Sequence, residues 1–122
     1  MTERRVAVLA DDLIWASRLV AAIERSGAQP LRSSTSQDLR RLLDDERPLS
    51  AVVIDLNGRA YDGVEAVRLA AAQGQPVLAV GQHEDLPLRR RALSAGARRV
   101  YSYNKLFRDG PQVMSDLLEG RL

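Results

Sequence analysis

Short apolar runs alternate with helical patterns from one end of the chain to the other, and this alternation limits the fold more than any other feature of the sequence. The runs have strand length and are continuous rather than interleaved with polar residues, which is typical of parallel strands buried on both faces. The predicted strands cover residues 6–10, 29–32, 51–54, 77–80 and 100–103, the second being the weakest pattern.

Between these runs, apolar residues recur at helical spacing. Ala16, Leu19, Val20 and Ile23 follow the first run at i, i+3, i+4 and i+7, and Gly27 ends that helix. Four more helices are predicted: one capped near Ser36 and ending before Pro48, one over residues 62–73, one over residues 86–95, and a last one around residues 113–118 with Pro111 in its first turn.

The alternation of five strands and five helices predicts a doubly wound α/β fold. Because parallel crossovers are right-handed, helices should cover both faces of a five-stranded parallel sheet, for which we expect the strand order 2-1-3-4-5. The 122 residues suffice for one domain, residues 1–122, and leave no room for a second. A composition of 45% apolar and 28% charged residues is ordinary for a globular chain and excludes wholesale disorder.

Composition also excludes several kinds of chemistry. The absence of cysteine rules out disulfide scaffolds and thiolate metal sites, and a single histidine rules out a multi-histidine zinc site. A formal net charge of +2, without a recognition helix or an aromatic platform, leaves nucleic-acid binding as a weak third hypothesis. No apolar run approaches the length of a membrane span, and the opening residues are too few for a signal peptide, so we expect a cytoplasmic protein with no membrane contact.

Three carboxylates follow two of the predicted strands. Asp11 and Asp12 come directly after the first strand, and Asp55 ends the third. These strands are neighbours in the expected order and their carboxyl ends share one edge of the sheet, so the three side chains should converge. An oxygen-only cluster suits Mg²⁺, beside which Asp55 could act as a nucleophile toward a phosphoryl group. The alternative is that the acids only cap the helices that follow.

Five short segments, at matching spacing, resemble the response-regulator receiver domain, the phosphoacceptor module of two-component signalling. Residues 8–12 look like the family's first strand and acidic pair, and residues 53–55 look like the strand that ends in its phosphoacceptor aspartate. Asn57 falls where the family offers a backbone carbonyl to the metal, residues 62–63 open the third helix, and residues 95–97 match the Ala-Gly-Ala before the fifth strand. The resemblance implies a flavodoxin-like fold, with Mg²⁺ held by the side chains of Asp11, Asp12 and Asp55 and the backbone carbonyl of Asn57.

The chain departs from the family pattern at the ends of the fourth and fifth strands. Receivers carry a Ser or Thr where this chain has Gly81, and a Lys where it has Tyr103. The family's aromatic switch position is Val100, which cannot report a rotamer change. Lys105 lies two residues beyond the expected lysine position, and a two-residue bulge would be needed to bring it to the pocket.

These departures predict a degenerate receiver, or pseudo-receiver, that acts through protein–protein contacts. The alternative is a working response regulator, in which Asp55 takes a phosphoryl group from a histidine kinase with Mg²⁺. In neither case do we expect an enzyme beyond autocatalytic phosphoryl transfer to Asp55. A lysine ammonium beside Asp55 would favour the phosphoacceptor, whereas Tyr103 in that place would favour the interaction module.

An arginine-rich segment is the candidate partner surface. The resemblance implies that the fourth helix, fifth strand and fifth helix form the usual surface for dimerisation or output, and the alternative is a solvated face. We expect Trp15 at the edge of the core, with a partner contact as the alternative, and His83 in an exposed loop. The expected partner is a histidine kinase, an output protein or a second copy. The arginines concerned are Arg89, Arg90, Arg91, Arg98 and Arg99.

Overall fold

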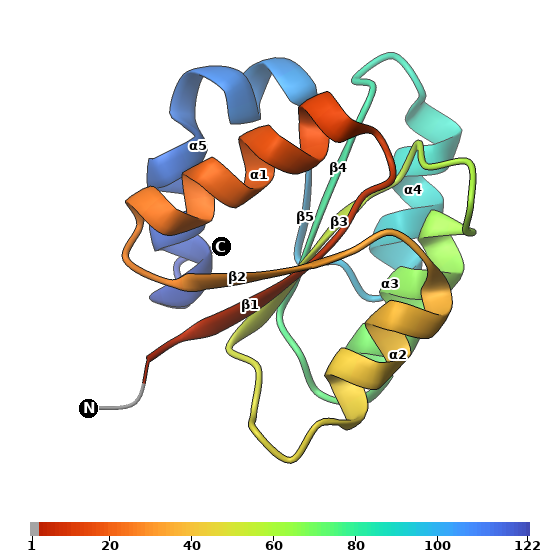
Figure 1. Ribbon diagram of the computed structural model, residues 1–122. Coiled ribbons are helices and arrows are strands. Elements are labelled where there is room, and N and C mark those ends of the chain that lie inside the picture. The colour runs from red at the N-terminus through yellow and green to blue at the C-terminus, as the bar shows by residue number, and fades with distance from the viewer. Residues whose placement is uncertain (1–2) are drawn as a thin grey trace.

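The computed structural model describes residues 3–122, and in these residues five strands alternate strictly with five helices (Figure 1). The strands are parallel and are ordered β2-β1-β3-β4-β5, which confirms the predicted fold class and topology. No helix in this part of the chain is long and apolar enough to cross a membrane. In chain order the elements are β1 (Arg5–Leu9), α1 (Leu13–Arg25), β2 (Gln29–Ser33), α2 (Ser36–Asp44), β3 (Ala51–Asp55), α3 (Gly63–Ala72), β4 (Val77–Gly81), α4 (Leu86–Ala95), β5 (Arg99–Ser102) and α5 (Tyr103–Leu118).

The sheet separates two apolar cores. Figure 1 shows α1 and α5 on one face and α2, α3 and α4 on the other. Successive side chains of a strand point to opposite faces, so Val6 and Val8 of β1 join the core under α1 and α5, while Ala7 and Leu9 join the other. Every residue of β1, β3 and β4 is buried, which explains why these strands read as continuous apolar runs.

Each helix begins at a side-chain cap, and these caps fix the loops at the carboxyl ends of the strands. A capping oxygen satisfies backbone N–H groups that have no partner within the helix. Thr35, rather than Ser36, caps α2. The other caps are Asp12 on α1, Asp62 on α3, Asp85 on α4 and Ser102 on α5.

The end of β5 differs from the sequence prediction. We predicted a strand through residue 103, but the strand ends at Ser102, whose hydroxyl accepts from the Lys105 N–H at 3.2 Å and so starts a helix. Tyr103 is therefore the first residue of α5. Pro111 lies inside this helix rather than in its first turn, and Asp109 beside it is non-helical (φ −124°, ψ 21°), so α5 is kinked. A proline inside a helix removes one hydrogen bond and produces such a kink.

Candidate functional site

Asp55 is the centre of the site and is almost fully buried. It is the last residue of β3, lies between β1 and β4, and is 2% exposed. Its Oδ1 accepts from the Asn57 N–H at 3.1 Å and from the Tyr103 hydroxyl. Burial raises the pKa of Asp55 above its ordinary value and is the largest effect; the two hydrogen bonds lower it, and the charges of Asp11 and Asp12 raise it. The site thus holds a carboxylate that is costly to ionise.

Tyr103 lies at the position where the resemblance predicts a lysine. From the start of α5 its hydroxyl reaches the Asp55 carboxylate and lies 3.2 Å from Asn57 Oδ1. Its ring stacks on Trp15, with centroids 4.3 Å apart and planes tilted by 32°. Burial raises the pKa of Tyr103 first, and the hydrogen bond to Asp55 raises it further, so the phenol stays protonated and acts as a donor. Asp55 therefore faces a neutral hydroxyl, whereas the resemblance implies an ammonium.

Gly81 makes room for the side chain of Asn57. A Cβ on Gly81 would lie 3.2 Å from Asn57 Oδ1, closer than ordinary van der Waals contact. In that space Asn57 Oδ1 accepts from the Gln82 N–H at 3.3 Å and lies beside the Tyr103 hydroxyl. We predicted only a metal-binding backbone carbonyl for Asn57. The structure adds a side-chain role, which links the end of β4 to the start of α5.

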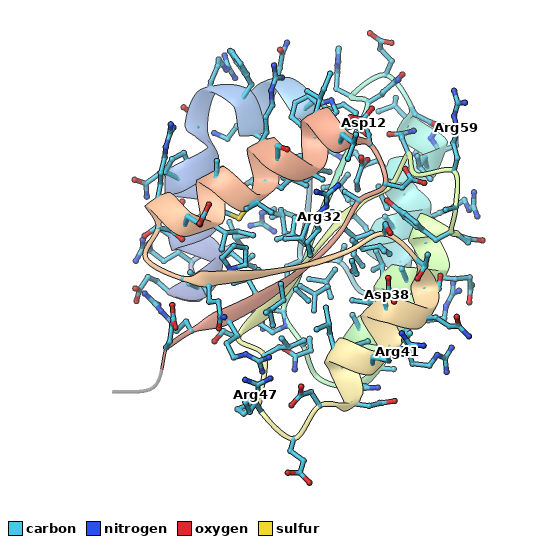
Figure 2. All side chains as sticks on the ribbon, in the orientation of Figure 1. Asp12, Arg32, Asp38, Arg41, Arg47 and Arg59 are labelled. Atoms are coloured by element: carbon cyan, nitrogen blue, oxygen red, sulfur yellow. The ribbon has the colours of Figure 1, made fainter. Side chains whose placement is uncertain are left out.

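Asp11 and Asp12 are each engaged by backbone donors. Asp11 Oδ2 accepts from the N–H groups of Arg59 at 2.8 Å and Ala60 at 2.7 Å, which holds the loop after β3. Asp12 caps α1 through the N–H groups of Ile14 and Trp15, at 2.9 and 3.1 Å, as the capping alternative predicted. Figure 2 shows Asp12 and Arg59 at the same end of the molecule.

The positions of the carboxylates test whether they could hold Mg²⁺ together. Asp11, Asp12, Asn57 and Arg59 line a pocket of about 350 Å³, whereas Asp55 is buried and does not line it. Within residues 3–122, no group of three or more Asp, Glu, His or Cys residues is placed to hold a metal ion. In this structure the three carboxylates therefore do not form the joint cluster that we expected. Binding of Mg²⁺ by Asp11, Asp12, Asp55 and the Asn57 carbonyl stays a prediction.

Lys105 lies away from Asp55. Its Nζ pairs with Asp109 Oδ2 at 3.0 Å and lies 5.7 Å from the centre of the Tyr101 ring, and it makes no ion pair with Asp55. The bulge that would bring it to the pocket is absent, because β4 and β5 pair residue for residue up to Gly81 and Ser102. The suggested pocket role of Lys105 is thus corrected: helix α5 begins before it and turns its side chain toward Asp109.

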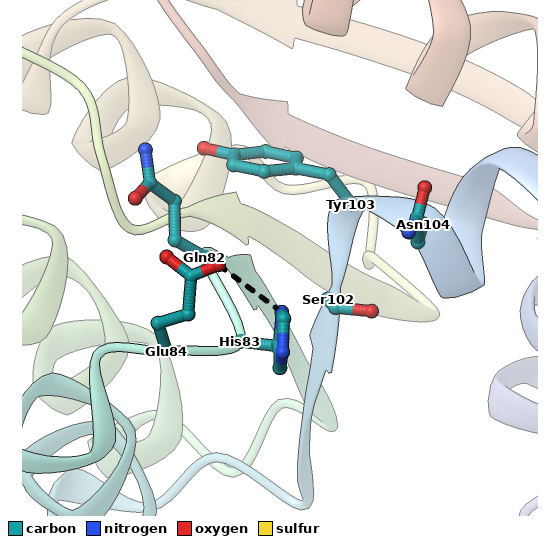
Figure 3. Close-up of a pocket in the computed structure, with 6 residues that line it drawn as sticks. All are labelled: Gln82, His83, Glu84, Ser102, Tyr103 and Asn104. Carbon is teal, nitrogen blue, oxygen red and sulfur yellow. Dashed lines mark ion pairs between the residues drawn. The ribbon is translucent and has the colours of Figure 1, made fainter.

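A second, polar pocket of about 170 Å³ lies beside Tyr103. Figure 3 shows the Tyr103 ring extending from the start of α5, with Gln82, His83 and Glu84 on the loop after β4. His83 is exposed, as predicted, and its Nδ1 lies 4.0 Å from the Glu84 carboxylate. Trp15 packs at the edge of the core, also as predicted. Val100, at the position of the family's aromatic switch residue, is buried in the core under α2, α3 and α4.

Tyr61 is a structural member of the site that the sequence analysis missed. Its hydroxyl donates to the Asp55 backbone carbonyl at 2.7 Å and lies 3.3 Å from that of Leu9, so it ties together the ends of β3 and β1. Burial raises the pKa of Tyr61, with the Asp55 charge next, so this hydroxyl also stays protonated. The one sequence signal is Gly58, because a side chain there would collide with the Tyr61 ring.

The arginine face is exposed along α4 and β5. Arg89, Arg90, Arg91, Arg98 and Arg99 are all solvent-exposed, and none of them forms an ion pair within residues 3–122. Helix α4 also exposes two leucines, Leu86 at 52% and Leu93 at 42%, which are two helical turns apart.

Known proteins resemble this chain in structure but not in sequence. No model of a known protein family matches the sequence, and no curated protein matches it either. A response regulator from Thermotoga maritima superposes with a TM-score of 0.81 at 14% identity, over 97% of this chain and 99% of the other. The beryllofluoride-activated DrrB receiver domain gives 0.80 at 19% identity, with the same coverage. The NtrC4 receiver domain, solved as a beryllofluoride-activated dimer, gives 0.76 at 20% identity over 97% and 98%.

The agreement covers almost the whole of each chain, whereas the identity is low. Together with the 2-1-3-4-5 sheet and the buried aspartate at the end of β3, it leads to one conclusion. The chain has the fold of a response-regulator receiver domain.

Proposed function

We propose that this chain is a receiver-like signalling module whose phosphoryl pocket is closed by Tyr103 and which acts through protein–protein contacts. The observation that carries the proposal is the hydrogen bond from the Tyr103 hydroxyl to the Asp55 carboxylate. The hydroxyl occupies the face of Asp55 on which the resemblance places a lysine and an incoming phosphoryl group.

Charge supports the same proposal. A phosphoryl group brings negative charge to a site where Asp11 and Asp12 already raise the pKa of Asp55. The ammonium of Lys105 is paired with Asp109. Loss of one charge-assisted hydrogen bond costs on the order of 1.5–3 kcal/mol, which alone slows phosphorylation by roughly ten- to a hundredfold. Closure of the pocket by Tyr103 adds to this loss. Gly81 and Val100 also lack the side chains through which a phosphorylated receiver would signal.

The arginine face is the proposed contact surface for an acidic protein partner. Five exposed guanidinium groups without ion pairs, flanked by Leu86 and Leu93, offer both charge and apolar area. Arginine is suited to bidentate contacts with carboxylates. The dimeric state given for NtrC4 makes a second copy of this chain the alternative occupant.

The test is exposure of the protein to acetyl phosphate and Mg²⁺, followed by intact-mass measurement. We expect no phosphoryl adduct beyond that of Asp55→Asn, which keeps the shape of the side chain but removes the nucleophile. An adduct that forms on the wild type and is absent from Asp55→Asn would refute the closed pocket. Arg59, the cation that lines the acidic pocket, would then be the next residue to replace.

A further inference from the structure

The loop after β3 places an asparagine directly before a glycine, at Asn57 and Gly58. In such a pair the backbone nitrogen of the second residue can attack the side-chain carboxamide of the first, because glycine has no Cβ to obstruct the approach. The packing of the loop requires glycine here, since a side chain would collide with the Tyr61 ring. A chemically reactive pair is therefore built into the loop that follows the buried Asp55.

The nitrogen atoms that take part in this attack are free in the structure. The Gly58 N–H, whose nitrogen is the nucleophile, donates to no residue that the structure describes, whereas the next two N–H groups of the loop both bind Asp11. The Asn57 amide nitrogen, which is the leaving group, also donates to none of the described residues. Asn57 is exposed and lines the pocket of about 350 Å³, so water can reach the carboxamide and ammonia can leave.

The oxygen of the same carboxamide is held by a donor. Asn57 Oδ1 accepts from the Gln82 N–H at 3.3 Å and lies 3.2 Å from the Tyr103 hydroxyl oxygen. Attack at the side-chain carbon moves negative charge onto Oδ1, and a fixed N–H beside this atom stabilises the charge. One backbone donor is thus aimed at the atom where charge develops, while the amide nitrogen is free to depart.

We propose that Asn57 and Gly58 form a self-modification site, at which Asn57 is converted into a carboxylate in the folded protein. The Gly58 nitrogen loses its proton to hydroxide from water and bonds to the Asn57 side-chain carbon. The carbon–nitrogen bond of the amide then breaks, and ammonia leaves with a proton from water. Water opens the resulting succinimide ring at either of its carbonyl groups, which gives aspartate or isoaspartate. The overall reaction consumes one water molecule and releases one ammonia, with no oxidation or reduction.

The new carboxylate would act on the closed pocket, and this part of the inference rests on the proposed function. The Tyr103 hydroxyl has a single proton, which it donates to Asp55. A carboxylate at position 57 places a second negative charge beside that hydroxyl, in a pocket that Asp11 and Asp12 already line. Isoaspartate also lengthens the backbone of the loop by one carbon. Both products should therefore weaken the closure of the pocket by Tyr103.

Asn104 is the internal control for the test, because it is the only other asparagine of the chain. It is also exposed, but it is followed by Lys105, whose N–H donates to the Ser102 hydroxyl at 3.2 Å. The full chain is incubated at mildly alkaline pH, and peptides that contain each asparagine are followed by mass and by chromatography. We expect Asn57 to change from amide to acid at least tenfold faster than Asn104 and to give two separable products of equal mass.

A parallel incubation in urea shows whether the reaction belongs to the folded protein. We expect the rate at Asn57 in the folded protein to lie within tenfold of the rate in the unfolded chain. A reaction that required global unfolding would be slower by the unfolding equilibrium constant, which is roughly a thousandfold or more. A folded-state rate more than tenfold below that in urea, or a rate no higher than that of Asn104, would overturn the self-modification site.

The variant Asn57→Asp isolates the effect of the new charge on the pocket. It should denature at a lower urea concentration than the wild type at neutral pH. Asn104→Asp is the matched control, because it adds the same charge in the first turn of α5, where the helix dipole favours an anion. Equal denaturation midpoints for Asn57→Asp and the wild type would overturn the effect on closure. Phosphorylation of Asp55 is measured separately, so failure of the modification and failure of the proposed function are distinguishable.

Discussion

The site has two halves, one at the carboxyl ends of β1 and β3 and the other at the carboxyl ends of β4 and β5. The first half matches the receiver resemblance, whereas the second departs from it. At the ends of β1 and β3, the acids Asp11, Asp12 and Asp55 all lie where the receiver resemblance places them. At the ends of β4 and β5, Gly81 and Tyr103 lie where the resemblance implies a Ser or Thr and a Lys.

The residues at the ends of β4 and β5 nevertheless make a connected set of contacts with Asn57 and Asp55. The Asn57 carboxamide occupies the space beside Gly81 and meets the Tyr103 hydroxyl, which in turn binds Asp55. Asn57, Tyr103 and Asp55 thus form one connected set of polar contacts next to Gly81.

The largest effect should come from reversing both replacements. In Gly81→Ser/Tyr103→Lys, the serine displaces the Asn57 side chain and the lysine supplies an ammonium near Asp55. We expect acetyl phosphate and Mg²⁺ to phosphorylate this variant at a rate at least tenfold above that of the wild type, measured by intact mass.

Two controls sharpen this result. Adding Asp55→Asn to the double variant should abolish the adduct, and Lys105→Ala should have no effect because Lys105 is paired with Asp109. A double variant that folds and is still not phosphorylated would show that Gly81 and Tyr103 are not what prevents phosphorylation of Asp55.

Removing the hydroxyl of Tyr103 should have an intermediate effect. Tyr103→Phe leaves the buried Asp55 carboxylate with one donor fewer, which should lower the free energy of unfolding by about 1–3 kcal/mol in urea denaturation at neutral pH. Tyr101→Phe is the matched control, because Tyr101 packs against the same core and its hydroxyl makes no hydrogen bond to another described residue. Equal losses in the two variants would show that the hydrogen bond adds little.

The smallest effect is a pH-dependent one at Asp55. Its pKa in the folded protein lies above the ordinary value of 3.8, so the folded state binds the proton more tightly than the unfolded state does. The associated stability is present below pH 3.8 and is lost as the pH rises through the raised pKa. Asp55→Asn should therefore be more stable than the wild type at neutral pH, with an advantage that shrinks toward pH 4. Urea denaturation across this range measures the difference, and a constant difference would contradict the assigned pKa.

The fold and half of the site could be predicted from the sequence because both depend on local patterns. The continuous apolar runs of β1, β3 and β4 reflect burial on two faces, and Asp55 follows directly from the end of one such run. The resemblance also predicts that Tyr103 takes the place of the family's lysine. Fixed spacing along a strand is information that one sequence carries.

The remaining contacts depend on space and on choices between structures of similar energy. Asn57 turns its side chain inward because Gly81, distant in the sequence, leaves room for it. The sequence predicts a fifth strand that runs through Tyr103, yet the Ser102 hydroxyl caps a helix there. The stacking of Arg18 on Phe107 joins two helices at opposite ends of the chain, and no periodicity predicts it.

The kink in α5 has a consequence for access to the buried aspartate. Pro111 has no N–H to donate to the carbonyl of Phe107, so the backbone ladder of α5 is interrupted between its first turns and the remainder. Those first turns are held by the Ser102 cap, the Tyr103 hydroxyl and the Lys105–Asp109 pair, together with the packing of Leu106 in the core. Such a segment can open locally at a lower free energy than the whole domain needs to unfold. The amides of residues 105–108 should thus exchange with solvent faster than those of residues 113–117, and each opening would uncover Asp55 while the sheet stays folded.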